Sequence, residues 1–197
     1  MSVSTLDATK AWPSRELEHG RQLFRAQFSP DGRFVAAGGQ DKLVHLWELE
    51  KDEKKALDGH KTWISSLVFH PKGKKILFGS THLDPGAIKK QKDEIDFRSS
   101  GKKKRYSWDY DEHMDIFASP LDKTHPVRLT DALGYDAEAG YSPDGLKIVF
   151  CSTRSAYQGD LSAEEEKLRE IDLAYFGEIY IMNSDGSEQK QLTFSPG

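Results

Sequence analysis

The sequence is short of cysteine and has no long apolar run. Its 197 residues include one cysteine, so an internal disulfide framework is excluded. No stretch of about 18 apolar residues is present, and residues 1–20 lack the basic-then-apolar order of a secretory signal. We therefore expect no membrane insertion, and we expect a cytoplasmic location for the chain as given.

Neither sign of charge is in clear excess. There are 28 Lys and Arg against 32 Asp and Glu, which gives a formal net charge of −4. A dedicated nucleic-acid binder normally carries a distinct positive excess, so the balance argues against nucleic acid as a partner. Apolar residues make up 37% of the chain and charged residues 30%, a composition that can bury a core without a metal or a disulfide.

Signatures of common enzyme classes are also missing. The sequence has no G-x-S-x-G elbow, no H-E-x-x-H, no G-x-x-x-x-G-K-[ST] and no G-x-G-x-x-G after a strand. We therefore name no catalytic residue, expect no cofactor, and predict that the chain is not an enzyme.

What the sequence does contain is a repeat. Residues 28–39 (FSPDGRFVAAGG), 69–80 (FHPKGKKILFGS) and 141–152 (YSPDGLKIVFCS) each have an aromatic residue, then a proline, then a glycine four residues after the aromatic. Proline presets φ at a turn, and glycine takes the left-handed conformation that ends it. Each phrase therefore predicts a β-hairpin.

Two further strands follow each hairpin. The third elements are short, alternate in polarity and are rich in Ile, Val and aromatic residues, as strands are. They fall at 43–50, 114–121 and 178–185, and the fourth elements end at Leu57, Leu129 and Leu192. Such a four-stranded unit is stable only beside others of its kind. We therefore predict an all-β fold, a β-propeller segment of about three four-stranded blades with two short helical insertions.

The repeats resemble two families of β-propeller. Residues 20–60, with AQFSPDGRFVAAGGQDKLVHLWELE, look like a WD repeat, although Glu48 replaces the second letter of the name. Residues from 61 onwards, with RLTDALGYDAEAGYSPDGLKIVF and GEIYIMNSDGSEQKQLT, resemble TolB-like propellers. Tyr135-Asp136 stands where TolB-like repeats carry an acidic residue, and the resemblance implies hydrogen bonding between blades there.

These resemblances imply a function. WD-repeat and TolB-like propellers mostly act as docking platforms, so we expect a non-enzymatic scaffold that binds a protein or a peptide. The TolB-like resemblance also implies a bacterial protein and allows a periplasmic location. The enzymatic alternative is a substrate-gating propeller, as attached to prolyl-oligopeptidase-type serine hydrolases, or a metal-dependent propeller enzyme.

For a metal-dependent protein the candidate ligands flank the first insertion. Carboxylates crowd residues 109–115, and oxygen ligands suit divalent cations. The candidates are His82, Asp109, Asp111 and His113. Asp111 aligns with Asp41 just before a third strand, and we expect both of these carboxylates to cap turns.

The repeats divide the chain into four parts. Residues 1–19 form an N-terminal segment with a possible latch strand, and residues 20–58 a WD-like blade. Residues 59–130 form a TolB-like blade with an insertion at 81–113, and residues 131–197 another, with an insertion at 153–177 and a connector to a missing blade. Closed propellers have about four to eight blades. We therefore expect an incomplete propeller, whose open blade edges allow self-association.

Both insertions interrupt the same connection of the blade, so we expect them on one rim. Asp84-Pro85 predicts the start of a helix that Gly101 ends, and Ser162 and Glu165 predict a capping box on a second helix. Loops on a rigid scaffold commonly carry binding sites. We predict partner contacts on this rim at Lys102, Lys103, Lys104, Arg105, Tyr106, Trp108 and Tyr110.

Overall fold

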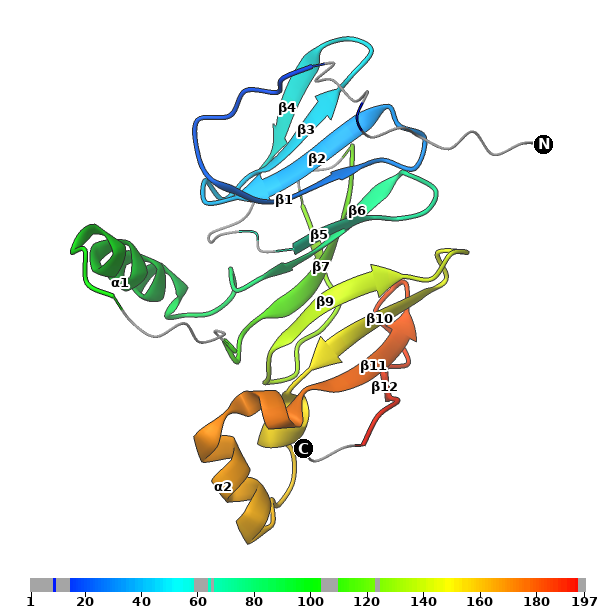
Figure 1. Cartoon of the computed structure of the whole chain (residues 1–197). Helices are drawn as coiled ribbons and strands as arrows, with labels where there is room; N and C mark the ends of the chain where they lie inside the picture. The colour runs from blue at the N-terminus through cyan, green and yellow to red at the C-terminus, as the bar shows by residue number, and fades with distance from the viewer. Residues whose placement is uncertain are drawn as a thin grey trace.

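Three small sheets lie side by side in the molecule (Figure 1). The computed structural model describes residue 9 and residues 15–58, 64, 66–103, 110–122 and 125–194. Each sheet has four antiparallel strands that pair in chain order. This confirms the predicted all-β segment of three four-stranded blades, with a helical insertion in two of them.

The strands of each blade are consecutive in the sequence. Blade 1 consists of β1 (Leu23–Phe28), β2 (Phe34–Gly39), β3 (Val44–Glu48) and β4 (Glu53–Leu57). Blade 2 consists of β5 (Ser66–Phe69), β6 (Lys75–Ser80), β7 (Asp115–Pro120) and β8 (Val127–Arg128). Blade 3 consists of β9 (Asp136–Tyr141), β10 (Lys147–Ser152), β11 (Glu178–Asn183) and β12 (Lys190–Gln191).

The predicted hairpin turns connect the first two strands of every blade. Gly32, Gly73 and Gly145 have φ values of 71°, 67° and 75°, the left-handed conformation that the repeat requires of its glycine. In two of the turns an aspartate, Asp31 or Asp144, accepts hydrogen bonds from a neighbouring serine and from the backbone two residues on. Pro-Asp-Gly therefore acts as a turn in both blades that contain it.

The blades pack through two apolar interfaces, which we call seam 1/2 and seam 2/3. First strands are neighbours, since β1 contacts β5 and β5 contacts β9. Seam 1/2 buries a cluster that includes Leu46, Ile64 and Phe78, and seam 2/3 buries one that includes Phe150 and Met182. This stacking is what the repeat predicted, because each sheet covers the apolar face of its neighbour.

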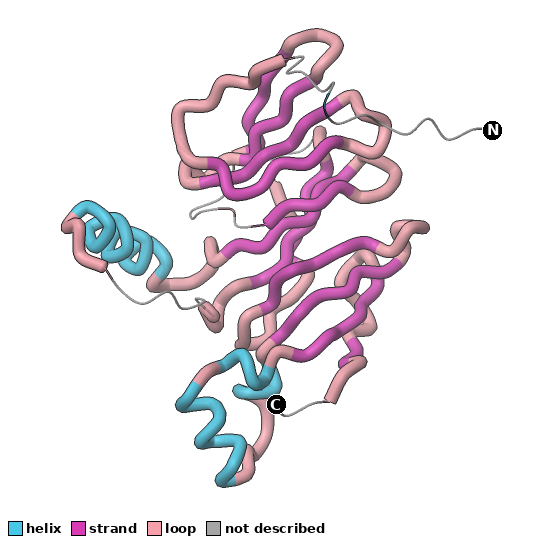
Figure 2. The backbone as a smooth tube through the Cα atoms, viewed as in Figure 1, coloured by secondary structure: helices cyan, strands magenta, loops and turns pink. Residues whose placement is uncertain are grey.

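The two insertions form short helices outside the sheets (Figure 2). The first contains α1 (Ala87–Ser99), and the second contains η2 (Arg154–Tyr157), α2 (Ala163–Ile171) and η3 (Leu173–Phe176). The predicted capping box on α2 is confirmed, since the Ser162 hydroxyl accepts from the Glu165 backbone and the Glu165 carboxylate accepts from the Ser162 backbone. No helix among the described residues is long and apolar enough to cross a bilayer.

The predicted start of α1 is wrong by two residues. The helix is capped at Gly86, so Pro85 is not its first residue. Asp84 instead accepts from the backbone N–H of Gly86 at 2.7 Å and forms an ion pair with Lys90. The carboxylate therefore closes the turn before the helix. Gly101, with a φ of 69°, follows the last turn as expected.

The outer faces of the first and third blades differ. Trp47 and His45 of β3 point away from seam 1/2 and are 7% and 5% exposed, because His19 and Lys54 lie against them. On blade 3, Val149 and Ile179 point away from seam 2/3 and are 44% and 42% exposed. Within the described residues 15–22, which include part of the predicted latch strand, no strand forms.

Candidate functional site

The rim that carries the insertions is organised around one lysine. Lys90 of α1 places its ammonium 3.0 Å from Asp84 Oδ2 and 3.1 Å from Asp111 Oδ2. Although burial opposes the shift, hydrogen bonds to these two carboxylates raise the pKa of Lys90. The two carboxylates come from opposite ends of the first insertion. Lys90 therefore ties the base of α1 to the loop that enters β7.

Asp41 and Asp111, which align in the repeat, each cap a turn, as predicted. Asp111 Oδ1 accepts from the backbone N–H of His113 at 3.0 Å, and Asp41 Oδ1 accepts from that of Leu43 at 3.4 Å. Both hydrogen bonds lie immediately before a third strand. The carboxylates thus shape equivalent turns in blades 1 and 2.

The predicted metal ligands serve separate contacts. His82 is buried against the ring of Phe117, at 4.3 Å between centroids, whereas His113 lies 4.0 Å from Asp84. The other oxygen of Asp111 is taken by Lys90. Asp109 lies outside the described residues. Among the residues that the structure describes, the ligand atoms of His82, Asp111 and His113 do not come together as a group that could hold a metal ion.

The predicted partner-binding residues lie directly after α1. Lys102 and Lys103 are exposed. Tyr110 is half-buried and packs edge-on against Tyr135, at 5.3 Å between ring centroids, which ties the end of the insertion to blade 3. Lys104, Arg105, Tyr106 and Trp108 lie outside the described residues.

The second insertion meets the first at this rim. Gly134 lies between them, since a Cβ added to it would be 2.6 Å from the Cα of Arg154, the first residue of η2. The backbone N–H of Gly134 donates to Glu112 O at 2.9 Å across the same boundary. The expectation that both insertions share one rim therefore holds for these residues.

Behind the rim, seam 2/3 holds a buried polar network. Arg154 Nη2 donates to Asp136 Oδ2 at 2.6 Å, and its Nε donates to Ser152 Oγ at 2.9 Å. On the blade 2 side, Arg128 Nη2 donates to Asp115 Oδ2 at 2.6 Å. Asp136 and Arg154 are 0% and 6% exposed, so this ion pair lies within the protein, whereas buried Asp115 pairs with an Arg128 side chain that is 38% exposed.

The expected bonding between blades occurs at Asp136. Its backbone N–H donates to Met114 O of blade 2 at 2.9 Å. Burial, against the opposing charge of Arg154, raises the pKa of its carboxyl group. Burial also raises the pKa of Asp115 to about 6, with Arg128 opposing the shift and Asp136 adding to it. Arg154 itself was not expected from sequence, because it stands at the start of what reads as an insertion.

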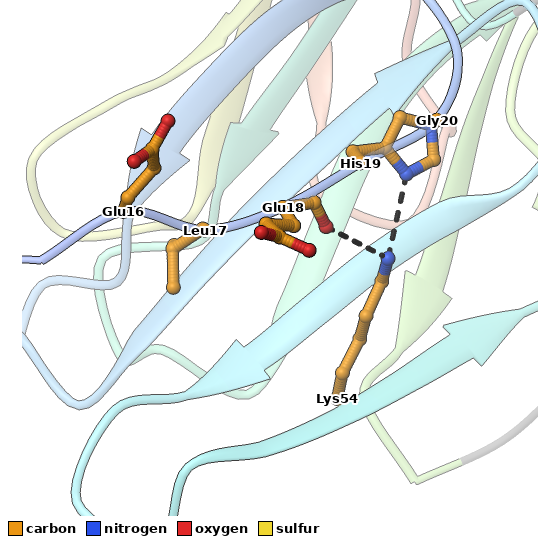
Figure 3. Close-up of a pocket in the computed structure, with 6 residues that line it drawn as sticks. All are labelled: Glu16, Leu17, Glu18, His19, Gly20 and Lys54. Atoms are coloured by element: carbon orange, nitrogen blue, oxygen red, sulfur yellow. Dashed lines mark hydrogen bonds between the residues drawn. The ribbon is translucent and has the colours of Figure 1, made fainter.

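A second cluster lies on blade 1 and was missed at the sequence level. His19 precedes β1, Asp41 lies in the β2–β3 turn and His45 lies on β3. His45 Nε2 donates to Asp41 Oδ2 at 2.5 Å, and His19 Nε2 lies 3.4 Å from the same oxygen. Beside it is a shallow groove lined by residues 16–20 and Lys54 (Figure 3). Only strand pairing brings His19 to the other two, so spacing along the chain gave no signal.

Comparison with known families identifies the repeats. Residues 13–48 and 51–83 match the family "WD domain, G-beta repeat". The second match extends the WD pattern from blade 1 into the first strands of blade 2. WD-repeat proteins generally act as non-enzymatic scaffolds that bind protein partners.

Curated relatives align with short parts of the chain. Nuclear distribution protein PAC1 of Gibberella zeae is 45% identical over 49 residues, 25% of this chain and 11% of that protein. The U3 snoRNP-associated protein-like YAOH of Oryza sativa is 35% identical over 71 residues, 36% of this chain and 14% of that protein. The aligned segments of the chain thus cover only 11% and 14% of the lengths of these relatives. They are fungal and plant proteins, so the bacterial origin expected from the TolB-like resemblance is not supported.

Solved structures share the fold over most of the chain. TolB from Acinetobacter baumannii has a TM-score of 0.52 and 19% identity, covering 88% of this chain and 33% of that one. The tricorn protease has a TM-score of 0.53 and 12% identity, covering 82% of this chain and 13% of that one. At these identities the likeness shows the propeller fold alone. The comparisons do not favour the gating or metal-dependent enzyme alternative.

Proposed function

We propose that this chain, a β-propeller of the WD-repeat and TolB-like kind, is a non-catalytic scaffold that binds a protein partner through α1 on its insertion-bearing rim. One observation carries the proposal. The helix is held at its base but leaves two isoleucines, Ile88 and Ile95, in solvent, and an apolar stripe on a fixed helix is a common recognition surface.

The base of α1 is anchored by the Lys90 contacts with Asp84 and Asp111. Ala87 is buried where the helix begins. Further along, the pairs Lys89–Asp93 and Glu94–Arg98 are four residues apart and support the helix along its exposed length. The helix is therefore presented in a defined direction without being covered by the blades.

Two isoleucines mark the face that would bind. Ile88 is 65% exposed and Ile95 is 48% exposed, and seven residues place both on one side of the helix. Residues 87–103 carry six basic and three acidic side chains. A segment with apolar residues flanked by acidic ones has the complementary chemistry. Lys102 and Lys103 extend this basic surface, as do Lys104 and Arg105 by sequence.

Tyr106, Trp108 and Tyr110 have different places in this proposal. Tyr110 contacts Tyr135 and holds the end of the insertion against blade 3, which makes it a support for the surface. In the sequence, Tyr106 and Trp108 stand between the basic run and Tyr110, and we propose that they add aromatic contacts to the partner. Aromatic side chains are enriched at such interfaces.

The test is site-directed crosslinking followed by titration. A photoreactive amino acid is placed at position 95 or, as control, at position 146 in the full chain. Leu146 is 61% exposed but lies at the β9–β10 turn, at the other end of blade 3 from its insertion. The protein crosslinked from position 95 is purified and titrated against the wild type, the double variant Ile88→Ser/Ile95→Ser, and Leu146→Ser.

We expect the double variant to weaken binding at least tenfold and Leu146→Ser to leave the dissociation constant within about twofold, since tenfold corresponds to about 1.4 kcal/mol. Both isoleucines are exposed, so the substitutions leave the blades intact. Equal affinity of the double variant and the wild type would refute the proposal, as would crosslinks that form equally from both positions.

Two further expectations stay as proposals beside this one. We propose that the chain works in the cytoplasm, and its similarity to fungal WD-repeat proteins favours this location. We also propose that it can self-associate through the outer face of blade 3, where Val149 and Ile179 are exposed. Sedimentation of the wild type and of Val149→Lys tests this, because a charge at the face would shift a dimer to monomer.

A further inference from the structure

The cluster on blade 1 brings together three side chains that bind transition metals. His19 Nε2, Asp41 and His45 each offer one ligand atom, and these atoms all lie within 4.8 Å of one another. Two imidazoles and one carboxylate form a common set for zinc sites that keep a fourth position open. The three residues come from three separate segments that the sheet of blade 1 holds in place.

The histidines are buried and one ligand atom lacks a partner. The side chains of His19 and His45 are 8% and 7% exposed. His19 Nε2 is directed at Asp41 Oδ2 but, at 3.4 Å, makes no hydrogen bond that satisfies its geometry. A buried polar atom without a hydrogen bond is costly, and an ion at this place would satisfy it.

The distances need a small adjustment. Ligand atoms of a tetrahedral zinc site lie about 3.3 Å apart, since each is about 2.0 Å from the ion. His19 and Asp41 already have this separation, at 3.4 Å, whereas His45 and Asp41 are 2.5 Å apart because a hydrogen bond joins them. Replacing that proton by an ion requires a movement under about 1 Å.

Lys54 is expected to weaken binding of the ion, and this effect can be measured. Its ammonium donates to His19 Nδ1 and to Glu18 O, each at 3.4 Å (Figure 3). If His19 binds through Nε2, its Nδ1 carries the proton and cannot accept from Lys54. The lysine also adds positive charge beside the site. It is therefore a residue whose removal strengthens binding.

We propose that His19, Asp41 and His45 form a binding site for a divalent transition metal of the zinc class, reached from the groove beside His19. The site is independent of the partner surface on α1. It would join the segment before β1 to β3, so a bound ion would stabilise blade 1 in addition to any other use.

The experiment uses the full chain and two probes, Zn²⁺ and Co²⁺. Calorimetric titration with Zn²⁺ is expected to show one saturable site per chain, and Co²⁺ should give the visible absorption of a tetrahedral complex. His19→Gln and His45→Gln should each weaken binding at least a hundredfold. His113→Gln is the matched control, since His113 also lies near two carboxylates, Asp84 and Glu112, and it should bind as the wild type does.

Lys54→Gln sharpens the test, because it is expected to tighten Zn²⁺ binding severalfold and no general loss of fold would do that. Circular dichroism of each apo variant shows whether blade 1 is retained. Absence of saturable binding by the wild type overturns the proposal, and so does unchanged binding by a folded His45→Gln. Loss of binding in His113→Gln overturns it too, because the ion would then sit on the rim.

Discussion

Seam 1/2 and seam 2/3 join equivalent strands, but an equivalent position holds an apolar residue in the first seam and a charged residue in the second. Ile64 and Asp136 each stand five residues before the aromatic that ends the first hairpin strand, and both are 0% exposed. Ile64 packs on Gly38, where an added Cβ would lie 2.7 Å from its Cγ2. Asp136 requires Arg154 and Ser152 as partners. One repeat therefore tolerates an apolar contact or an ion pair at its interface, provided that the partners change together.

Among the variants that test this difference between the seams, Arg154→Ala is expected to have the largest effect on stability. The guanidinium is the cation for buried Asp136, and it also lies over the rings of Phe150 and Tyr180, at 5.3 and 4.8 Å. Removing one partner of a buried ion pair leaves an uncompensated charge, so we expect a loss of about 3–5 kcal/mol in the free energy of unfolding. Urea denaturation measures the loss, and hydrogen exchange should place the opening in blade 3.

Lys89→Ala is the control for Arg154→Ala. Lys89 and Asp93 are 84% and 62% exposed, and an exposed pair contributes well under about 1 kcal/mol. Equal losses from the two variants would mean that the seam pair is no different from a surface pair.

On the apolar seam, Ile64→Ala is expected to cost about 2–4 kcal/mol. The residue is fully buried among Leu46, Leu67 and Phe78, so truncation removes apolar contacts and leaves a cavity. Thermal and urea unfolding measure the change, with exposed Val127→Ala as the control. A cost below about 1 kcal/mol would show that Gly38 and its neighbours close the space.

Of the two seams, the polar one should respond to pH. The pKa of Asp115 is about 6 in the folded protein and about 3.9 in an unfolded chain, so the folded state binds the proton more tightly. Its contribution to stability is therefore complete below about pH 4 and is lost as the pH rises through 6. We expect the difference in Tm between wild type and Asp115→Asn to change by about 2–4 °C between pH 5 and 7.

That difference isolates Asp115, because the other groups titrate in both proteins. A pH-independent difference in Tm would mean that Arg128 keeps the carboxylate ionised throughout this range. Ile64→Val, a variant of the apolar seam, should show the same pH dependence as the wild type.

The smallest expected effect is at the other end of seam 1/2. Gln27 Oε1 accepts from the backbone N–H of Phe69 at 2.9 Å and joins blade 1 to blade 2. Gln27→Ala leaves this part-buried N–H without its acceptor, and we expect a loss of about 0.5–1 kcal/mol. Gln27→Glu, which keeps an acceptor, should retain most of the stability in the same urea titration.

The repeated parts of the fold were predictable because each carries its own local signal. The hairpin glycines need a left-handed conformation, and the third strands alternate in polarity, so both are visible in a short window of sequence. The start of α1 could not be predicted in this way, because the side chain of Asp84 contacts Lys90 and Gly86 instead of capping the helix. His19, Asp41 and His45 meet only once the strands of blade 1 pair.

The two outer faces of the stack of blades differ in where they expose apolar side chains. On blade 1 the segment before β1 and Lys54 lie over His45 and Trp47, and on the same face Phe28 of the edge strand β1 is 63% exposed. Blade 3 has Val149 and Ile179 of its outer face in solvent. A sheet that packed on blade 3 would therefore cover apolar side chains of its two central strands, β10 and β11, whereas one that packed on blade 1 would cover an apolar side chain at its edge.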